Sequence, residues 1–232
     1  MDAPVPGYLT RNLVTHVDGV AFQLRVLSDL QQYADPDSHA DALGISSAQW
    51  SLFGQLWPAG RLLAGAMQHV DIAGRRILEL GCGIGLASLV LQRRGADVIA
   101  SDIHPLADAF LAYNAALNAL PAVHYRHMRW EEPLPSLGMF DLVIASDVLY
   151  ERGHAALLSE VVARHTLPEA EVIVSDAGRG HGAAFARALG VLGFIPTAGD
   201  EHAAIAAETG PGATPGCRLL HFRRTLASRR AA

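Results

Sequence analysis

The sequence contains no lysine, because all 18 of its basic residues are arginine. Without a lysine there is no Schiff-base chemistry, which excludes a pyridoxal-phosphate enzyme. A P-loop is excluded for the same reason, since its lysine reaches the nucleotide phosphates. The only cysteines, Cys82 and Cys217, provide neither a disulfide framework nor a metal-binding spacing. The 11 histidines show no paired helical spacing, so we expect no metal site.

Long apolar runs and an excess of positive charge are also missing. No stretch reaches the roughly 18 uninterrupted apolar residues of a membrane span. The N-terminal segment MDAPVPGYLTRN lacks the basic-then-apolar pattern of a secretory signal. The net charge of −5 disfavours nucleic-acid binding, which needs clustered basic residues. We therefore expect a cytoplasmic protein, monomeric by default, that binds neither membrane nor nucleic acid.

Half of the residues are hydrophobic, and short apolar segments alternate with helical ones. Strands are predicted at residues 76–80, 97–101, 122–126, 140–146, 171–176, 192–196 and 217–223. Helices are predicted at residues 85–94, 105–119, 152–165 and 179–190. This alternation predicts an α/β fold with a doubly wound, seven-stranded, mostly parallel sheet and an antiparallel edge strand.

The first third of the chain has a different pattern. The segment from Leu13 to Leu27 reads as a β-hairpin turning at Asp18-Gly19, a dipeptide typical of type I′ turns. Residues 31–49 are polar and predict a mobile loop, and a helix is expected to begin at Pro58. We expect residues 1–50 to form an N-terminal hairpin and loop extension, and residues 51–232 to form one globular domain.

A glycine-rich loop follows the first strand of the predicted sheet. In LELGCGIG, Gly81, Gly83 and Gly85 let backbone N–H groups approach a ligand. Their spacing differs from the G-x-G-x-x-G of dinucleotide sites, and the preceding Glu79 suits an ammonium or sulfonium group and repels a pyrophosphate. Asp102 ends the next strand, where an acid reaches the ribose of either ligand. The loop favours S-adenosylmethionine, while an NAD-dependent oxidoreductase and a purely structural turn remain alternatives.

Two further groups of residues add a family resemblance. LELGCGIGLASLVL followed by DVIASDIHP resembles the first two motifs of seven-strand, Rossmann-like methyltransferases. GQLWPAGRLLA, Trp130 and FDLVIASDVLYERGH resemble, in this order, the family-16 protein methyltransferases, which have a D-x-x-Y element after the fourth strand. The resemblance covers roughly residues 10–225. It implies S-adenosylmethionine as the cofactor and a lysine side chain of a protein as the acceptor.

The resemblance also assigns roles to the tryptophans. The tryptophan of L-W-P, Trp57, is expected beside the cofactor, and Trp130 is expected to pack on the adenine. An aromatic face also attracts a sulfonium charge. We expect the cofactor site to be formed by Trp57, Glu79, Gly81, Cys82, Gly83, Gly85, Asp102, Ile103, Trp130 and Ser146.

Asp147 and Tyr150, the ends of the D-x-x-Y element, are the expected catalytic residues. If the chain enters a helical turn there, both side chains face the cleft. A lysine ammonium, with a pKa of roughly 10.4, must lose a proton before it attacks a methyl group. Asp147 is expected to orient the acceptor in a desolvated site, and Tyr150 to fix its nitrogen. The alternative is that Asp147 caps the following helix and Tyr150 packs below it.

The sequence also contains features that bear on the identity of the acceptor. SDAGRGHG, which contains Arg179, resembles the substrate-facing segment of the electron-transfer-flavoprotein branch of the family. A small-molecule amine or hydroxyl acceptor and an inactive cofactor-binding scaffold remain alternatives to protein-lysine methylation. Acceptor choice is expected to depend on residues 31–49, on the hairpin and on the segment after Asp176.

Overall fold

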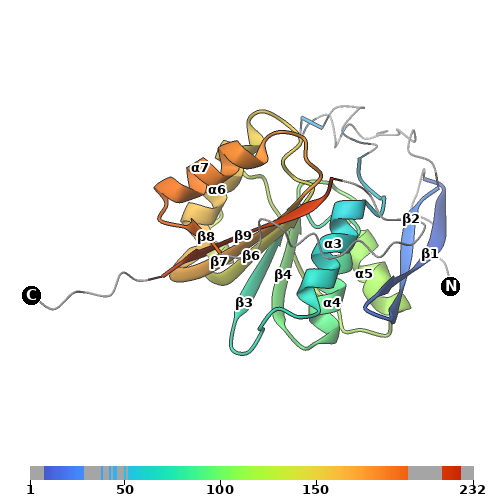
Figure 1. Cartoon of the computed structure of the whole chain (residues 1–232). Coiled ribbons are helices and arrows are strands. Elements are labelled where there is room, and N and C mark those ends of the chain that lie inside the picture. The colour runs from blue at the N-terminus through green and yellow to red at the C-terminus, as the bar shows by residue number, and fades with distance from the viewer. Residues whose placement is uncertain are drawn as a thin grey trace, which may run out of the picture.

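A computed structural model describes residues 8–28, 38, 42, 44, 45, 50, 52–197 and 216–225 (Figure 1). The strands are β1 (Thr10–Val17), β2 (Val20–Leu27), β3 (Arg76–Leu80), β4 (Asp97–Asp102), β5 (His124–His127), β6 (Phe140–Ser146), β7 (Thr166–Asp176), β8 (Ile195–Pro196) and β9 (Arg218–Arg224). The helices are α3 (Pro58–Met67), α4 (Leu86–Arg93), α5 (Ala107–Leu117), α6 (His154–His165) and α7 (Gly182–Val191), with a 3₁₀ turn at Pro135–Leu137.

Seven of these strands form one sheet, in the order β5-β4-β3-β6-β7-β9-β8. The strands from β5 to β7 are all parallel. At the other end of the sheet, β9 runs antiparallel to β7, and the short edge strand β8 pairs antiparallel with β9. The predicted doubly wound α/β fold, with its antiparallel pairing at one edge and its N-terminal hairpin, is confirmed.

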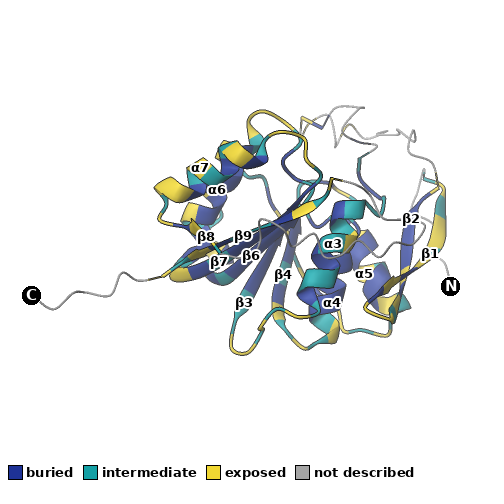
Figure 2. Cartoon of the chain, in the orientation of Figure 1, coloured by how far each residue is buried: buried dark blue, intermediate teal, exposed yellow. Residues whose placement is uncertain are grey.

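The sheet separates two hydrophobic cores, because alternate residues of a strand point to opposite faces (Figure 2). In β3, Ile77 packs with the core beneath α3, α4 and α5, and Leu78 packs with the core beneath α6 and α7. In β6, Leu142 and Val143 divide in the same way. Burial on both faces explains why these strands read as continuous apolar runs.

Two differences from the predicted elements lie at glycines. Gly193 has φ 83° and follows the C-terminal end of α7, so the predicted strand at 192–196 is reduced to the two residues of β8. Gly180 has φ 91°, which delays the start of α7 to Gly182. The predicted polar loop at 31–49 lies largely outside the described residues. Among those described, no helix combines the length and the hydropathy needed to cross a bilayer.

Besides apolar packing, the β1–β2 hairpin is bonded to the sheet domain by two asparagines, Asn114 in α5 and Asn118 at the C-terminal cap of that helix. Asn114 is buried; its Oδ1 accepts a hydrogen bond from the backbone N–H of Arg25 (2.6 Å), and its Nδ2 donates to the carbonyl of Ile84 (2.9 Å). One turn later, Asn118 accepts from the N–H of Gln23 (2.9 Å) and donates to its carbonyl (2.7 Å). The amides therefore bond the outer edge of β2, and Asn114 connects the hairpin to the glycine loop.

We expect Asn114→Ala to lower the free energy of unfolding by about 2–3 kcal/mol, because a buried N–H and a buried C=O lose their partner. Urea denaturation monitored by circular dichroism measures this loss. Asn118→Ala is the matched control, and its loss should be smaller because Asn118 is partly exposed. Equal losses for the two variants would contradict the assignment of Asn114 as the main attachment.

Candidate active site

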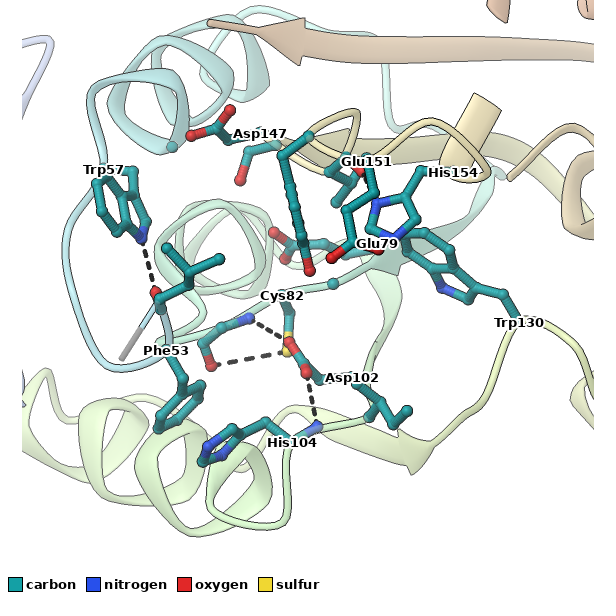
Figure 3. Close-up of a pocket in the computed structure, with 18 of the residues that line it drawn as sticks. Phe53, Trp57, Glu79, Cys82, Asp102, His104, Trp130, Asp147, Glu151 and His154 are labelled. Atoms are coloured by element: carbon teal, nitrogen blue, oxygen red, sulfur yellow. Dashed lines mark hydrogen bonds and ion pairs between the residues drawn. The ribbon is translucent and has the colours of Figure 1, made fainter. Parts of the chain in front are cut away.

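The carboxyl ends of β3, β4 and β6 lie side by side at one edge of the sheet. Leu80, the last residue of β3, is in register with Ser101 and Ala145, the next-to-last residues of β4 and β6. The residues that follow these strands are therefore brought together, and a cavity of about 470 Å³ opens there (Figure 3). All the predicted site residues except Gly85 line this cavity.

The glycine loop needs its glycines for two different reasons. Gly81 has φ 65°, and a Cβ there would lie 2.9 Å from Val148 Cγ1. Gly85 has φ 85°, and its Cβ would lie 2.2 Å from Leu111 Cδ1, so this glycine lets α5 pack closely against the start of α4. Gly85 thus faces α5 on the side of the loop away from the cavity, whereas Gly81 lines the cavity.

Glu79 is almost completely buried at the base of the cavity. Its Oε2 accepts hydrogen bonds from the backbone N–H of Ser88 (3.0 Å) and from the Ser88 hydroxyl. Burial raises the pKa of Glu79 to about 7, although both bonds from Ser88 oppose the rise. A buried acid of this kind is ionised most readily when a cationic group lies beside it.

The raised pKa of Glu79 predicts a pH-dependent stability of the cofactor-free protein. Between its ordinary pKa of 4.5 and its raised pKa, folded Glu79 holds a proton that the unfolded chain releases. The free energy of unfolding should therefore fall as pH rises from about 4.5 to 7, by roughly 3 kcal/mol at 1.4 kcal/mol per unit. Denaturation at pH 5 and pH 8 should show this loss in the wild type and a smaller one in Glu79→Gln. Identical losses in the two proteins would contradict the prediction.

Asp102 holds together the two loops that flank it. Its Oδ2 accepts a hydrogen bond from the N–H of Gly83 and its Oδ1 accepts one from the N–H of His104, each at 2.8 Å (Figure 3). Burial raises the pKa of Asp102, and the backbone donors offset part of this rise. Each carboxylate oxygen can accept a second bond, so Asp102 can also accept from hydroxyl groups of a ligand.

Asp147 does not begin a helical turn, contrary to the geometry that the sequence suggested. Its φ is 51°, in the left-handed region, and its backbone N–H donates to the carbonyl of Ser175 on β7 (2.8 Å). Helix α6 begins only at His154, with Gly153 before it, so Asp147 does not cap that helix. The Asp147 carboxylate lines the cavity and forms a two-pronged ion pair with Arg179.

Tyr150 reaches the same cavity from the loop between β6 and α6. Burial raises the pKa of its phenol to about 12, with a smaller contribution from the nearby Glu151 carboxylate. The phenol is therefore neutral at physiological pH and can both donate and accept a hydrogen bond. Its ring packs edge-on against His154 (4.5 Å between centroids), whose Nδ1 bonds the carbonyl of Val148 (2.8 Å).

The two tryptophans stand on opposite sides of the glycine loop (Figure 3). Trp57 precedes α3, and its Nε1 donates to the carbonyl of Leu52 (2.8 Å), which fixes the ring at the cavity wall. Trp130 packs edge-on against His154, with ring centroids 5.4 Å apart. Each tryptophan is therefore held in place by the residues around it.

Sequence reasoning missed several residues that line the cavity, among them Phe53, His104 and Glu151. Phe53 and His104 stack face to face, 3.8 Å apart and at 5° to one another. Phe53 lies four residues before Trp57, and His104 lies two residues after Asp102. Their closeness in the sequence to these predicted site residues is the feature that could have identified them. Within the described part of the chain, no cluster of histidine, cysteine and acidic side chains is placed to hold a metal ion.

A Rossmann-like sheet with a glycine loop and strand-end acids is the architecture of nucleotide-binding enzymes, the methyltransferases among them. Comparison with protein families gives the narrower assignment: the family model described as lysine methyltransferase matches residues 42–184. The chain belongs to the lysine methyltransferase family. The predicted family resemblance and the predicted enzyme class are confirmed.

Individual relatives agree with this assignment. The mouse electron transfer flavoprotein beta subunit lysine methyltransferase is 25% identical over 77% of this chain and 70% of its own length. The zebrafish protein N-lysine methyltransferase METTL21A is 32% identical over 58% of this chain and 67% of its own length. Three further electron transfer flavoprotein beta subunit lysine methyltransferases, from rat, frog and zebrafish, also match, and this chain spans only 50–59% of their length.

Solved structures show the same fold. The 16S rRNA N2 G1207 methyltransferase RsmC of T. thermophilus, solved with AdoMet and guanosine, has a TM-score of 0.63 at 19% identity. That match covers 96% of this chain and 52% of that protein. The magnesium protoporphyrin IX methyltransferase of Synechocystis, solved with SAH, has a TM-score of 0.56 at 18% identity, over 72% of this chain and 84% of that one.

Proposed function

We propose that this chain is an S-adenosylmethionine-dependent N-methyltransferase that acts on a lysine side chain of a protein. The observation that carries the proposal is one shared cavity: Asp102 and the glycine loop line one part of it, and Asp147 and Tyr150 line another. A nucleoside-bearing methyl donor and a side-chain acceptor can therefore meet there. The family assignment supports lysine as the acceptor group.

The residues present fit S-adenosylmethionine. At Gly83 a Cβ would have no neighbour within 4 Å, so the loop backbone is open to a ligand. Asp102 offers carboxylate lone pairs for the ribose, and Glu79 offers a buried negative charge for the amino group. Trp57 and Trp130 provide aromatic surface. When bound, S-adenosylmethionine supplies a methyl group on a sulfonium, and the electrons of the breaking C–S bond return to sulfur as the lysine nitrogen lone pair forms the N–C bond.

Asp147 and Tyr150 act on the acceptor side of this proposal. The Asp147 carboxylate accepts a hydrogen bond from the lysine nitrogen, and the neutral Tyr150 phenol fixes the same nitrogen from a second direction. Their contribution is orientation of the nitrogen lone pair, which can account for a large part of a rate enhancement. The cavity walls remove water, which favours the uncharged amine over the ammonium.

Three further features belong to the same proposal. We assign residues 1–50 to an N-terminal extension and residues 51–232 to one methyltransferase domain. Cytoplasmic action is supported by the free thiols of Cys82 and Cys217. Action on protein rather than nucleic acid is supported by the net charge of −5, and a monomer is the default assignment.

The test is transfer of a labelled methyl group from S-adenosylmethionine to the proteins of a lysate of the source cells. Because the chain has no lysine, any methyl-lysine recovered after hydrolysis comes from an acceptor and not from the enzyme. The names of the vertebrate relatives make electron transfer flavoprotein beta subunit the first purified acceptor to try. Labelled methyl-lysine supports the proposal. Label confined to small metabolites would establish a small-molecule acceptor, and no label at all, with S-adenosylhomocysteine binding intact, an inactive scaffold.

A further inference from the structure

The acid proposed to orient the acceptor already has a cationic partner. Arg179 Nε lies 3.1 Å from Asp147 Oδ1, and Arg179 Nη2 lies 3.0 Å from Asp147 Oδ2. Both carboxylate oxygens are therefore engaged by one planar guanidinium, the strongest form of this ion pair. The Asp147 side chain is 10% exposed and that of Arg179 is 42% exposed, so the carboxylate is the buried member of the pair and the guanidinium is the solvent-facing member.

The backbone around the pair is built to present it. Arg179 stands between Gly178 (φ 77°) and Gly180 (φ 91°) in the loop after β7, and both glycines adopt conformations that other residues rarely take. Asp147 itself has φ 51°, and its N–H is bonded to Ser175. Two consecutive strand ends therefore direct a carboxylate and a guanidinium at each other beside the acceptor position.

A lone carboxylate at this position would oppose the reaction. A negative charge close to a lysine stabilises the ammonium form, which has no lone pair with which to attack. The cavity already contains other carboxyl groups, namely Glu79, Asp102, Glu131 and Glu151, and only one other arginine, Arg129. The acceptor therefore enters an acidic site, in which the charge of Asp147 matters most because this residue is the nearest acid in the proposed arrangement.

We propose that Arg179 cancels the charge of Asp147 and so allows the acceptor lysine to occupy the site as a free amine. This inference rests on the proposed function. The guanidinium uses one lone pair of each Asp147 oxygen, and a second lone pair on each remains for an N–H of the amine. The lysine proton leaves to solvent before attack, Asp147 stays ionised and paired, and the N–C bond forms as the C–S bond breaks. Arg179 acts through Asp147 and is a positioning residue.

The other titratable groups near the pair come from several parts of the chain. They are Tyr150, Glu151 and His154 after β6, Asp176 at the end of β7, Cys217 before β9, and the cavity acids already named. Asp176 has its own arginine, because Arg218 Nη2 lies 3.1 Å from its Oδ2. Among the described residues, Arg179 is thus the ion-pair partner of Asp147.

The test is the pH dependence of lysine methylation in Arg179→Gln, with total lysate protein as the acceptor. The pH–rate profile should have a rising limb that reports loss of the lysine proton. In Arg179→Gln this limb should shift to higher pH by about one pH unit or more. At pH 7.5, kcat should therefore fall about tenfold per unit of displacement, and the apparent KM for the acceptor should be unchanged or lower, because the exposed carboxylate binds the ammonium well. Activity should recover at high pH.

Two matched variants separate charge from structure. Arg179→Lys keeps the positive charge and should keep the limb near its wild-type position. Arg187→Gln removes an exposed arginine of α7 and should change nothing. S-adenosylhomocysteine should stabilise every variant equally in a thermal-shift assay, which shows that each is folded and that the cofactor site is intact.

Three results would overturn the inference: a limb that stays in place in Arg179→Gln, an equal displacement in Arg179→Lys, or a faster rate in Arg179→Gln at every pH. The last result would mean that Arg179 blocks the acceptor position. If the wild type makes no methyl-lysine at any pH, the proposed function itself fails. If the wild type is active and the limb does not respond to the charge at position 179, only the role of Arg179 fails.

Discussion

Replacing Asp147 with asparagine is expected to lower kcat/KM for lysine methylation by about 100-fold or more while leaving cofactor affinity within about twofold. The variant loses the carboxylate that accepts from the amine nitrogen, and a misplaced nucleophile alone can cost about 10²-fold. It also leaves the Arg179 cation without its ion-pair partner, beside the acceptor. Labelled-methyl transfer and calorimetric titration with S-adenosylhomocysteine measure the two effects separately.

Asparagine is the suitable substitution because the backbone constrains the choice. Asp147 has φ 51°, a conformation that asparagine tolerates and alanine adopts only with strain. Asp147→Ala would therefore mix a backbone effect with the loss of the carboxylate. Retention of more than a third of the wild-type kcat/KM in Asp147→Asn would remove this residue from the catalytic assignment.

The same variant gives an independent check on Arg179. In the Asp147→Asn background the Arg179 cation has no carboxylate to cancel and should hold the pH limb below its wild-type position. Adding Arg179→Gln removes the second charge and should return the limb to about the wild-type position. In the wild-type background the same change should move it by about one unit or more. Arg179→Gln should therefore displace the limb from the wild-type position only while Asp147 is present, as expected of two residues whose charges cancel in one ion pair.

The sequence was sufficient to predict the sheet and the meeting of its strand ends, because both depend on local patterns. Apolar runs such as Leu142–Ala145 mark strands buried on both faces, and acids at the carboxyl ends of neighbouring parallel strands must lie at one edge of the sheet. Glu79 and Asp102 were predicted in this way, and the structure places both in the cavity.

What the sequence did not reveal depends on pairs of residues far apart in the chain. The partner of Asp147 lies 32 residues later, and Asn114 bonds a strand residue 89 positions earlier. No periodicity encodes such contacts, since they exist only after the helices pack on the sheet. The left-handed conformation of Asp147 is similar, because it is fixed by a hydrogen bond to the neighbouring strand β7.

Replacing Asp102 with alanine is expected to weaken S-adenosylhomocysteine binding about 100-fold. The variant loses the proposed acceptor for the ribose hydroxyls, and it also loses the bonds from Gly83 and His104 that hold two loops in place. Hydrogen bonds to charged groups are each worth about 1.5–3 kcal/mol, and a 100-fold loss corresponds to about 2.8 kcal/mol. Isothermal titration calorimetry measures the affinity directly.

Asp102→Ala should lower the free energy of unfolding of the unliganded protein by less than it weakens the free energy of S-adenosylhomocysteine binding. Burial raises the pKa of Asp102, so removing the carboxylate also removes the cost of desolvating it, which offsets part of the lost hydrogen bonding. Asp97→Ala is the matched control, because Asp97 lies exposed at the opposite end of β4, where its Oδ2 is 3.4 Å from Arg76 Nε. Its affinity for S-adenosylhomocysteine should match the wild type. An Asp102→Ala protein that is folded and binds within threefold of the wild type would mean that the cofactor does not use this strand end, and the role of the whole cavity would then have to be reassigned.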